Sequence, residues 1–413
     1  MIKWLSYSLS ILTFTSLVAD QIVYDEDFSP YAGGEDLITL NNAFLKLEDT
    51  LYPEPKNNGY SEKTNRLLNE FLITSPLNYL MTTVQHEVFG HGYRIRDIGK
   101  PKVRVNSYHI DAPIPYGTSG GSTNFSLNDK LTIRQMVAIN IAGMEATSIL
   151  ANRVKMHWLK DKKIPSRQST LYISSEQDIF SYVYGTDSEY YDIEHGNDVS
   201  AYIYWMNLYF PSSELTLGRI KKTAWLNLMD PMTFYSVYNQ FYYIFTGQEL
   251  KIPMIKIADV QFLPNLRYSF SPSGPELYLE SFFLLKDEPL YTYIKWGNYT
   301  GTPSFGAGFE HPRLIPFWNE NLGLRVNFFR ELKAQNALSA IDFIQDPSKE
   351  LALENFGGIE TRYGYSFHLI YSPSIGKVFF KPHLELGYKS VGFVQGESLN
   401  AGLIIRGGFD VKY

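Results

Sequence analysis

Two histidines and a glutamate lie within six residues of one another, at His86, Glu87 and His91. Imidazole nitrogens bind zinc, and a glutamate beside a zinc-bound water can accept the proton of that water. In the usual zinc-hydrolase helix the histidines are four residues apart, whereas here they are five apart. On a regular helix this spacing turns the two rings about 140° away from each other. A one-residue π-bulge would realign them, and Gly90 makes such a bulge easier, so we expect a widened turn near Gly90.

A catalytic zinc usually takes three protein ligands, so a third ligand is expected elsewhere in the chain. Glu145 is the candidate, because it lies in a segment, residues 137–146, that is apolar on nearly every side of a helix. A buried carboxylate without a partner would cost several kcal/mol, so a cation must lie next to it. The sequence therefore predicts Zn²⁺ bound by His86, His91 and Glu145, with Glu87 as the proton acceptor. By an alternative interpretation the His-Glu pair occurs by chance, and His91 only ends a helix.

The remaining histidines are weaker candidates. His195 precedes Asn197 and Asp198 and could donate a hydrogen bond to a substrate, but we favour a loop in which Asn197 or Asp198 caps the next helix. His109 lies on an alternating segment and is expected to be structural. The last group, which we expect at polar positions inside a barrel, comprises His311, His368 and His383.

The unusual spacing resembles that of a known family. His86-Glu87-x-x-x-His91 is similar to the HExxxH helix of the dipeptidyl peptidase III metallopeptidases. The resemblance implies that the extra residue is accommodated and that both histidines bind zinc. It covers six residues and one downstream glutamate, so it concerns the chemistry of the site and not the fold.

A second, partial similarity is to the site-2 protease class of membrane metalloproteases. In that class a Gly precedes the second histidine, and a short strand and then a helix with an Ala-Gly pair follow. The same order is present here, with Gly99, then residues 103–105, then Ala142-Gly143. The long apolar helices of that class are missing, so we do not adopt its topology.

The elements that position these residues change type along the chain. Residues 64–250 have mostly helical signals, including a start at Ser75-Pro76, another at Asp230-Pro231, and a stop at Gly247. Residues 103–105 alternate ahead of a Gly-rich stretch, which predicts a strand and a loop. We expect a helical metal-binding domain here.

Residues 251–413 alternate with a period of two, which is typical of strands. We count roughly eight to ten segments and expect an antiparallel β-barrel, with an α+β fold for the whole chain. The alternating row that ends at Tyr413 is similar to the terminal strand of bacterial outer-membrane barrels. In such a barrel the apolar rows face lipid, and Arg325, His383 and Glu385 face the lumen. The opposite orientation would indicate a soluble barrel or sandwich.

The N-terminal region is expected to contain a signal peptide for export, followed by a linker or arm. Residues 1–19 contain Lys3, a short apolar stretch and a small residue, Ala19, which together predict a signal peptide. Residues 20–63 are acidic and punctuated by proline and glycine, so we interpret them as a linker or arm.

Composition narrows the classes of function. The net charge of -6 provides no basic surface for nucleic acid, and the absence of cysteine leaves histidine and carboxylate as metal ligands. Aromatic residues make up 15% of the chain although its mean hydropathy is only -0.19, as in membrane barrels. We therefore expect a zinc metallopeptidase that acts on a peptide or protein and contacts outer-membrane lipid, or else lies in the periplasm. The alternative is a non-enzymatic outer-membrane barrel whose His-Glu helix is a plug or a structural metal clip.

Overall fold

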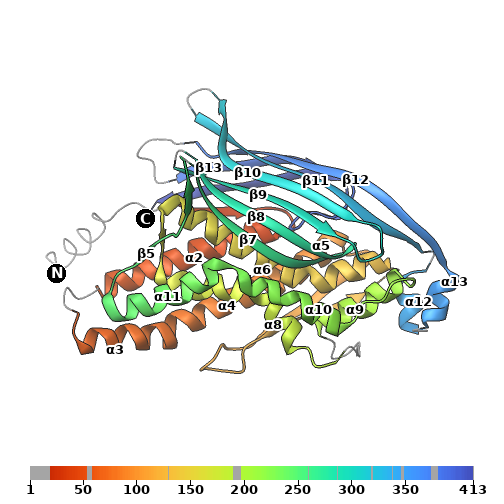
Figure 1. Cartoon of the computed structure of the whole chain (residues 1–413), viewed down its shortest axis with the longest axis horizontal. Coiled ribbons are helices and arrows are strands. Elements are labelled where there is room, and N and C mark those ends of the chain that lie inside the picture. Colours follow the sequence, from red (N-terminus) through yellow and green to blue (C-terminus); the bar gives the residue numbers. More distant parts are fainter. Residues whose placement is uncertain are drawn as a thin grey trace, which may run out of the picture.

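The computed structural model describes residues 19–53, 58–128, 130–188, 197–258, 260–285, 287–317, 320–336, 338–345, 348–373 and 380–412. The predicted signal peptide, except Ala19, and Tyr413 lie outside these residues. Helices and antiparallel strands form an α+β fold in which one curved sheet lies over a layer of helices (Figure 1). The strands and the long helices run along the same long axis of the molecule.

The large sheet has ten antiparallel strands in the order β1-β14-β13-β12-β11-β10-β9-β8-β7-β6. Its strands are β1 (Ala19–Tyr24), β6 (Ile255–Ile257), β7 (Val260–Ser271), β8 (Gly274–Leu285), β9 (Glu288–Gly297), β10 (Ser304–Phe317), β11 (Glu320–Asn336), β12 (Phe356–Tyr371), β13 (Phe380–Lys389) and β14 (Gly402–Lys412). Two small pairs are β2 (Val103–Ile110) with β3 (Gly121–Leu127), and β4 (Lys163–Ile164) with β5 (Leu250–Lys251).

The helices occupy most of the chain before the sheet. They are α2 (Pro30–Leu51), α3 (Tyr60–Asn69), η1 (Glu70–Thr74), α4 (Ser75–His86), η2 (Glu87–His91), α5 (Gly92–Ile98), α6 (Ile133–Asp161), η3 (Ser166–Gln168), α7 (Ser169–Glu176), α8 (Asp178–Gly185), α9 (Asp198–Tyr209), α10 (Leu217–Ala224), η4 (Trp225–Met229) and α11 (Pro231–Thr246). Two short helices, α12 (Ala340–Gln345) and α13 (Lys349–Glu354), lie between β11 and β12.

The sheet is open, so the prediction of a closed barrel was wrong. Strands β1 and β6 are its two edges and do not pair with each other. Helix α2 covers the β1 edge instead. Asp36 Oδ1 accepts a hydrogen bond from the Val23 backbone at 2.8 Å, and Thr39 Oγ1 donates one to the Gln21 carbonyl at 2.7 Å. These side chains satisfy backbone groups that a neighbouring strand would otherwise satisfy.

The region expected to be a linker forms β1 and α2. Ser29 caps the helix and Pro30 takes the first helical turn. Gly33, one of the glycines of that region, is a packing contact. A Cβ on Gly33 would lie 2.2 Å from the Phe89 ring, so only glycine lets α2 approach η2 this closely.

Helix α6 is the centre of the molecule. Thr132 and Gln135 form a capping box at its start, and Lys162 ends it in a left-handed conformation. Residues along almost its whole length are buried. One hydrophobic core joins α6 and α9 to the sheet, for example through Val137, Trp205 and Phe270, so helices and strands share a core.

The sheet has the reverse of the polarity of a soluble protein. Its outer face exposes large apolar side chains, including Phe328, Tyr363 and Leu403. Its inner face, toward the helices, buries charged side chains, and the predicted inward orientation of Arg325, His383 and Glu385 is confirmed. Among the described residues, no helix combines the length and the hydropathy needed to cross a membrane.

The contact between α2 and the sheet edge can be tested at Asp36. Asp36→Ala should lower the free energy of unfolding by about 1–3 kcal/mol, because the Val23 N–H loses its acceptor. Asp36→Asn keeps an acceptor oxygen and should cost less. Thermal unfolding followed by circular dichroism compares the two variants. Equal losses would mean that the hydrogen bond does not stabilise this edge.

Candidate metal centre

The helix that carries His86 and His91 contains the predicted widened turn. Residues 87–91 form a π-helical turn, η2, and the Gly92 backbone N–H donates to the Glu87 carbonyl five residues earlier. The extra residue brings the two rings to the same side, so that His86 Nε2 lies 3.2 Å from His91 Nε2. The π-bulge is therefore confirmed, and it solves the spacing problem.

Two glycines make room for this geometry. A Cβ on Gly90 would lie 2.6 Å from the Ala142 carbonyl oxygen, so glycine lets η2 pack directly against the α6 backbone. A Cβ on Gly143 would lie 2.1 Å from His86 Nε2. The His86 ring thus occupies space that any other residue at position 143 would fill.

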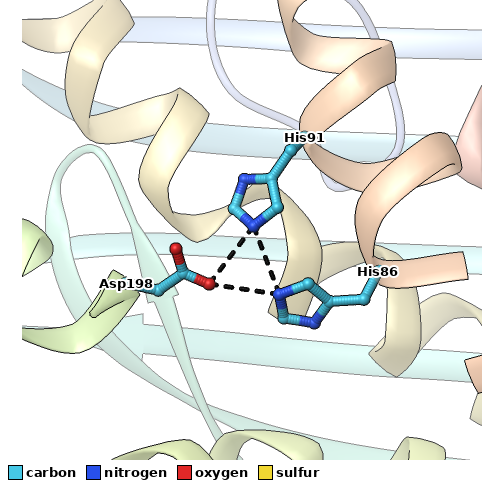
Figure 2. Close-up of side chains that lie close together, drawn as sticks. All are labelled: His86, His91 and Asp198. Carbon is cyan, nitrogen blue, oxygen red and sulfur yellow. Dashed lines mark hydrogen bonds and ion pairs between the residues drawn. The ribbon is translucent and has the colours of Figure 1, made fainter. Parts of the chain in front are cut away.

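The third member of the cluster is Asp198, at the first turn of α9. Its Oδ2 lies 3.1 Å from His86 Nε2 and 3.2 Å from His91 Nε2, which closes a nearly equilateral triangle (Figure 2). Zinc bonds to nitrogen and oxygen of about 2.0–2.1 Å place tetrahedral ligands about 3.3 Å apart. The three atoms are therefore already spaced like one face of a tetrahedral zinc site.

The hydrogen bonds behind the rings fix which nitrogen faces the centre. His91 Nδ1 lies 2.7 Å from the Ile139 carbonyl, which can only accept, so Nδ1 carries the proton. His86 Nδ1 lies 3.0 Å from Asp178 Oδ2, which also accepts from Thr147 at 2.7 Å. When both rings are neutral, both Nε2 atoms therefore direct lone pairs at each other and at the Asp198 carboxylate. Three acceptors in contact repel one another, so the cluster has to take up positive charge, which is either a proton on Nε2 or a metal ion between the three atoms.

The electrostatics of the centre also favour a cation. Burial lowers the pKa of His86, but Asp178 and then Asp198 raise it by more, so this pKa lies well above its usual value. Burial also opposes ionisation of Asp198, but the charge of His91 and hydrogen bonds from both rings bring its pKa below the usual range. The surrounding carboxylates therefore create a negative potential at the triangle.

Glu87 lies beside the cluster without joining it. Its Oε2 accepts a hydrogen bond from Thr123 Oγ1 of β3 at 2.6 Å, and the side chain is buried. Its charge raises the pKa of both His86 and His91, so the carboxylate is near both rings. Tyr182 stacks on the His86 ring at 4.8 Å between centroids. Thr123 and Tyr182 were not singled out from the sequence.

The structure does not bring Glu145 to the histidines, so its proposed role as third ligand is corrected. Arg94 Nη2 contacts both Glu145 oxygens at 3.0 and 3.1 Å, and the Gly396 N–H also donates to this carboxylate. The cation that the buried Glu145 requires is thus the guanidinium of Arg94. The carboxylate of the metal-type cluster is Asp198.

The sequence places Asp198 in a polar cluster with His195 and Asn197, and we assigned Asn197 or Asp198 to helix capping and not to metal binding. Asn197 caps α9 by accepting from the Val199 N–H, as predicted for Asn197 or Asp198. Because Asn197 is the cap, the next carboxylate is free to reach the histidines. His195 lies outside the described residues.

None of the other described histidines belongs to this cluster. His109 is exposed on β2 and pairs with Asp111. A second group that could hold a metal is His368, Glu385 and Glu397, but Arg325 and Arg406 already bind Glu385. A further divalent ion there would be repelled by both guanidiniums.

Comparison with known proteins adds no relative: no family model matches the sequence, and no curated protein or solved structure is similar to it. The chemistry of the centre therefore has to be inferred from its own geometry.

The identity of the third ligand can be tested by two substitutions. Asp198→Ala should weaken zinc binding by more than about 100-fold, because it removes one of three ligands. Glu145→Gln should leave zinc affinity unchanged but lower the free energy of unfolding by about 3 kcal/mol, because Arg94 loses a buried partner. Calorimetric zinc titration and denaturant unfolding measure the two effects. Zinc loss in Glu145→Gln alone would restore Glu145 as the ligand.

Proposed function

We propose that this chain is a zinc-dependent hydrolase, most specifically a metallopeptidase, held at the outer membrane. The observation that carries the proposal is the convergence of two imidazole Nε2 atoms and one carboxylate oxygen on one point, with Glu87 next to it. This arrangement combines the ligands of a catalytic metal with a proton acceptor.

Zinc fits the donor set. It binds nitrogen and oxygen donors in tetrahedral geometry, and His91, His86 and Asp198 supply one face of such a tetrahedron. Structural zinc sites usually have four protein ligands, whereas the cluster offers three among the described residues. Three ligands leave a position for water, which favours a catalytic site over a structural clip.

Glu87 is the proposed general base. Zinc would lower the pKa of a bound water, and Glu87 would accept the proton and pass it to the leaving group. The Thr123 hydroxyl holds the carboxylate in place, and Asp178 holds the His86 ring. The peptide bond as substrate is supported by the His-Glu helix, which resembles that of metallopeptidases.

The membrane location is supported by the polarity of the sheet. A soluble sheet would turn Phe328, Tyr363 and Leu403 inward and its charges outward, but the structure has the opposite arrangement. A broad exposed apolar face is stable where lipid covers it. The periplasm remains the alternative location, and it would require another partner for this face.

The role of Glu87 can be separated from metal binding. Glu87→Gln should keep zinc and lower hydrolysis by about 10²–10⁴-fold, because an amide cannot accept the proton. His86→Ala should lose zinc itself. Elemental analysis of purified protein and cleavage of an unstructured protein such as casein give the two readouts.

Glu354→Gln, on an exposed position of α13, is the matched control and should change neither property. Equal zinc loss in Glu87→Gln and His86→Ala would contradict the base role and make Glu87 a ligand or a structural group.

A further inference from the structure

The outward face of α11 is apolar along its whole length. Phe234, Tyr238, Phe241 and Phe245 are 63, 57, 51 and 58% exposed, and their spacing of four, three and four residues places them in one stripe. Between Pro231 and Thr246 there is no charged residue. A stripe of this kind normally faces a protein core, yet here it is exposed.

The inner face of α11 mixes apolar and polar side chains, since Met232, Tyr243 and Ile244 are buried beside Ser236 and Asn239. Ser236 and Asn239 are fully buried, and the Asn239 amide donates to the Ile164 carbonyl at 2.9 Å. Gln240 donates to Glu70 at 2.9 Å across the contact with η1. The exposed side of the helix is thus at least as apolar as its buried side, whereas a helix in water is expected to have a polar exposed side.

Two neighbouring helices extend this surface. Helix α3 and η1 lie next to α11, where Arg66 Nε donates to the Ile244 carbonyl at 3.1 Å, and they expose Leu68, Phe71 and Leu72. Helix α2 lies next in order, linked to α3 by a hydrogen bond from Asn69 to Glu48. Its exposed apolar residues are Leu40, Leu47 and Leu51.

These helices continue the apolar outer face of the sheet. Helix α2 covers the β1 edge, and the chain runs from α11 through β5 directly into β6, the other edge. Open strand edges are not stable in hydrocarbon, because their backbone groups have no water to bind. Covering the β1 edge with a helix meets this constraint at that edge without closing the sheet, and the opposite edge strand, β6, has only three residues.

We infer that the outer helical face, formed by α11, η1 and α2, contacts the lipid bilayer together with the outer face of the sheet, and that the metal centre lies at the rim of this apolar belt. The inference rests on the membrane location proposed above. It goes further by assigning part of the lipid contact to helices and by placing the site relative to the membrane.

The dimensions agree with a bilayer. Helix α11 has 16 residues, which gives a length of about 24 Å, and the apolar band of outer-membrane proteins is about 25 Å tall. Helix α11 has no charged residue, and its apolar stripe continues onto exposed apolar side chains of η1, α2 and the sheet, which favours lipid over a protein partner, because protein interfaces have polar rims.

Two exposed tryptophans mark one rim. Trp225 is on η4, just before α11, and Trp296 is on β9. They lie at similar levels along the strand direction. The Asn227 amide of η4 donates to the Tyr268 carbonyl of β7. Leu277 of β8 pairs with Tyr268 on one side and with Trp296 of β9 on the other. Tryptophan is enriched at membrane–water interfaces.

The metal centre lies at this same rim. Gln177 donates to the Asn227 carbonyl at 3.0 Å and to Thr233 at 2.9 Å, at the start of α11. The next residue, Asp178, holds the His86 ring. The substrate class that fits this position is a polypeptide segment close to the membrane surface.

The chain contains no cysteine, so single cysteines can be introduced and spin-labelled. The positions are Phe241→Cys on α11, Phe328→Cys on the sheet, Met229→Cys at the rim and Ser212→Cys as an exposed control. All replace exposed side chains, which protects the fold. The full chain is reconstituted into phosphatidylethanolamine–phosphatidylglycerol vesicles, and label accessibility to oxygen and to a water-soluble nickel chelate is measured.

Labels at positions 241 and 328 should be accessible to oxygen and shielded from nickel, position 229 should lie at headgroup depth, and position 212 should be open to nickel.

Nickel access at 241 but not at 328 would overturn the inference and leave the sheet in the membrane. Nickel access at both would refute the membrane location itself. Shielding of 241 from both reagents would indicate a protein partner on α11, and a label at 229 deep in the bilayer would overturn the rim position. Each of these last two results contradicts the inference. Tyr238→Cys, on the same stripe, serves as a second reporter if Phe241→Cys does not fold.

Discussion

The close approach of two helix backbones, η2 and α6, is the contact on which the metal centre depends. Gly90 and Gly143 meet there without side chains, and the His86 ring fills the remaining space. The same approach aligns His91 with the Ile139 carbonyl of α6, which fixes its tautomer. Since α6 is also the element against which the sheet packs, the centre and the sheet are positioned by one helix. A distortion of α6 would therefore affect both.

The part of the site that the sequence predicted is local, and the part that it missed is not. A spacing of five between His86 and His91 has few solutions in a helix, so the π-turn followed from geometry alone. The third ligand depends on which distant helix start reaches the rings, and Asp198 is 107 residues from His91. Glu145 satisfied the same argument about burial, because a buried carboxylate needs a cation, but that argument cannot distinguish a metal from Arg94.

The fold, too, was predicted where it depends on local sequence pattern and was missed where it depends on contacts between distant residues. Alternation predicted the antiparallel strands and the face that each side chain takes, including the inward Arg325 and Glu385, because the period of a strand is local. Closure of the sheet depends on what covers its edges, and this was decided by Asp36 and Thr39 of a helix whose glycines hid its pattern. Gly33 lies in the region that we interpreted as a linker or arm, and it is the position where α2 contacts Phe89.

The charged interior follows from the apolar exterior. If lipid covers the outer face, as we propose, apolar side chains need not fill the interior, and the polar residues of each strand must be satisfied inside. The inner face of the sheet meets this requirement with linked ion pairs. Arg153 joins Glu35 to Glu310, Arg325 joins Glu310 to Glu385, and Arg406 joins Glu385 to Glu397.

Such a chain of pairs is stable only when every member is present, because removal of one charge leaves its neighbours buried without a partner. The pairs also join strands β10, β11 and β13 to helices α2 and α6, which are distant in sequence. Apolar side chains such as Phe270 pack one part of the inner face of the sheet against the helices. The ion pairs connect the charged part of that face, and they hold the sheet against α6, the helix that positions the candidate metal centre.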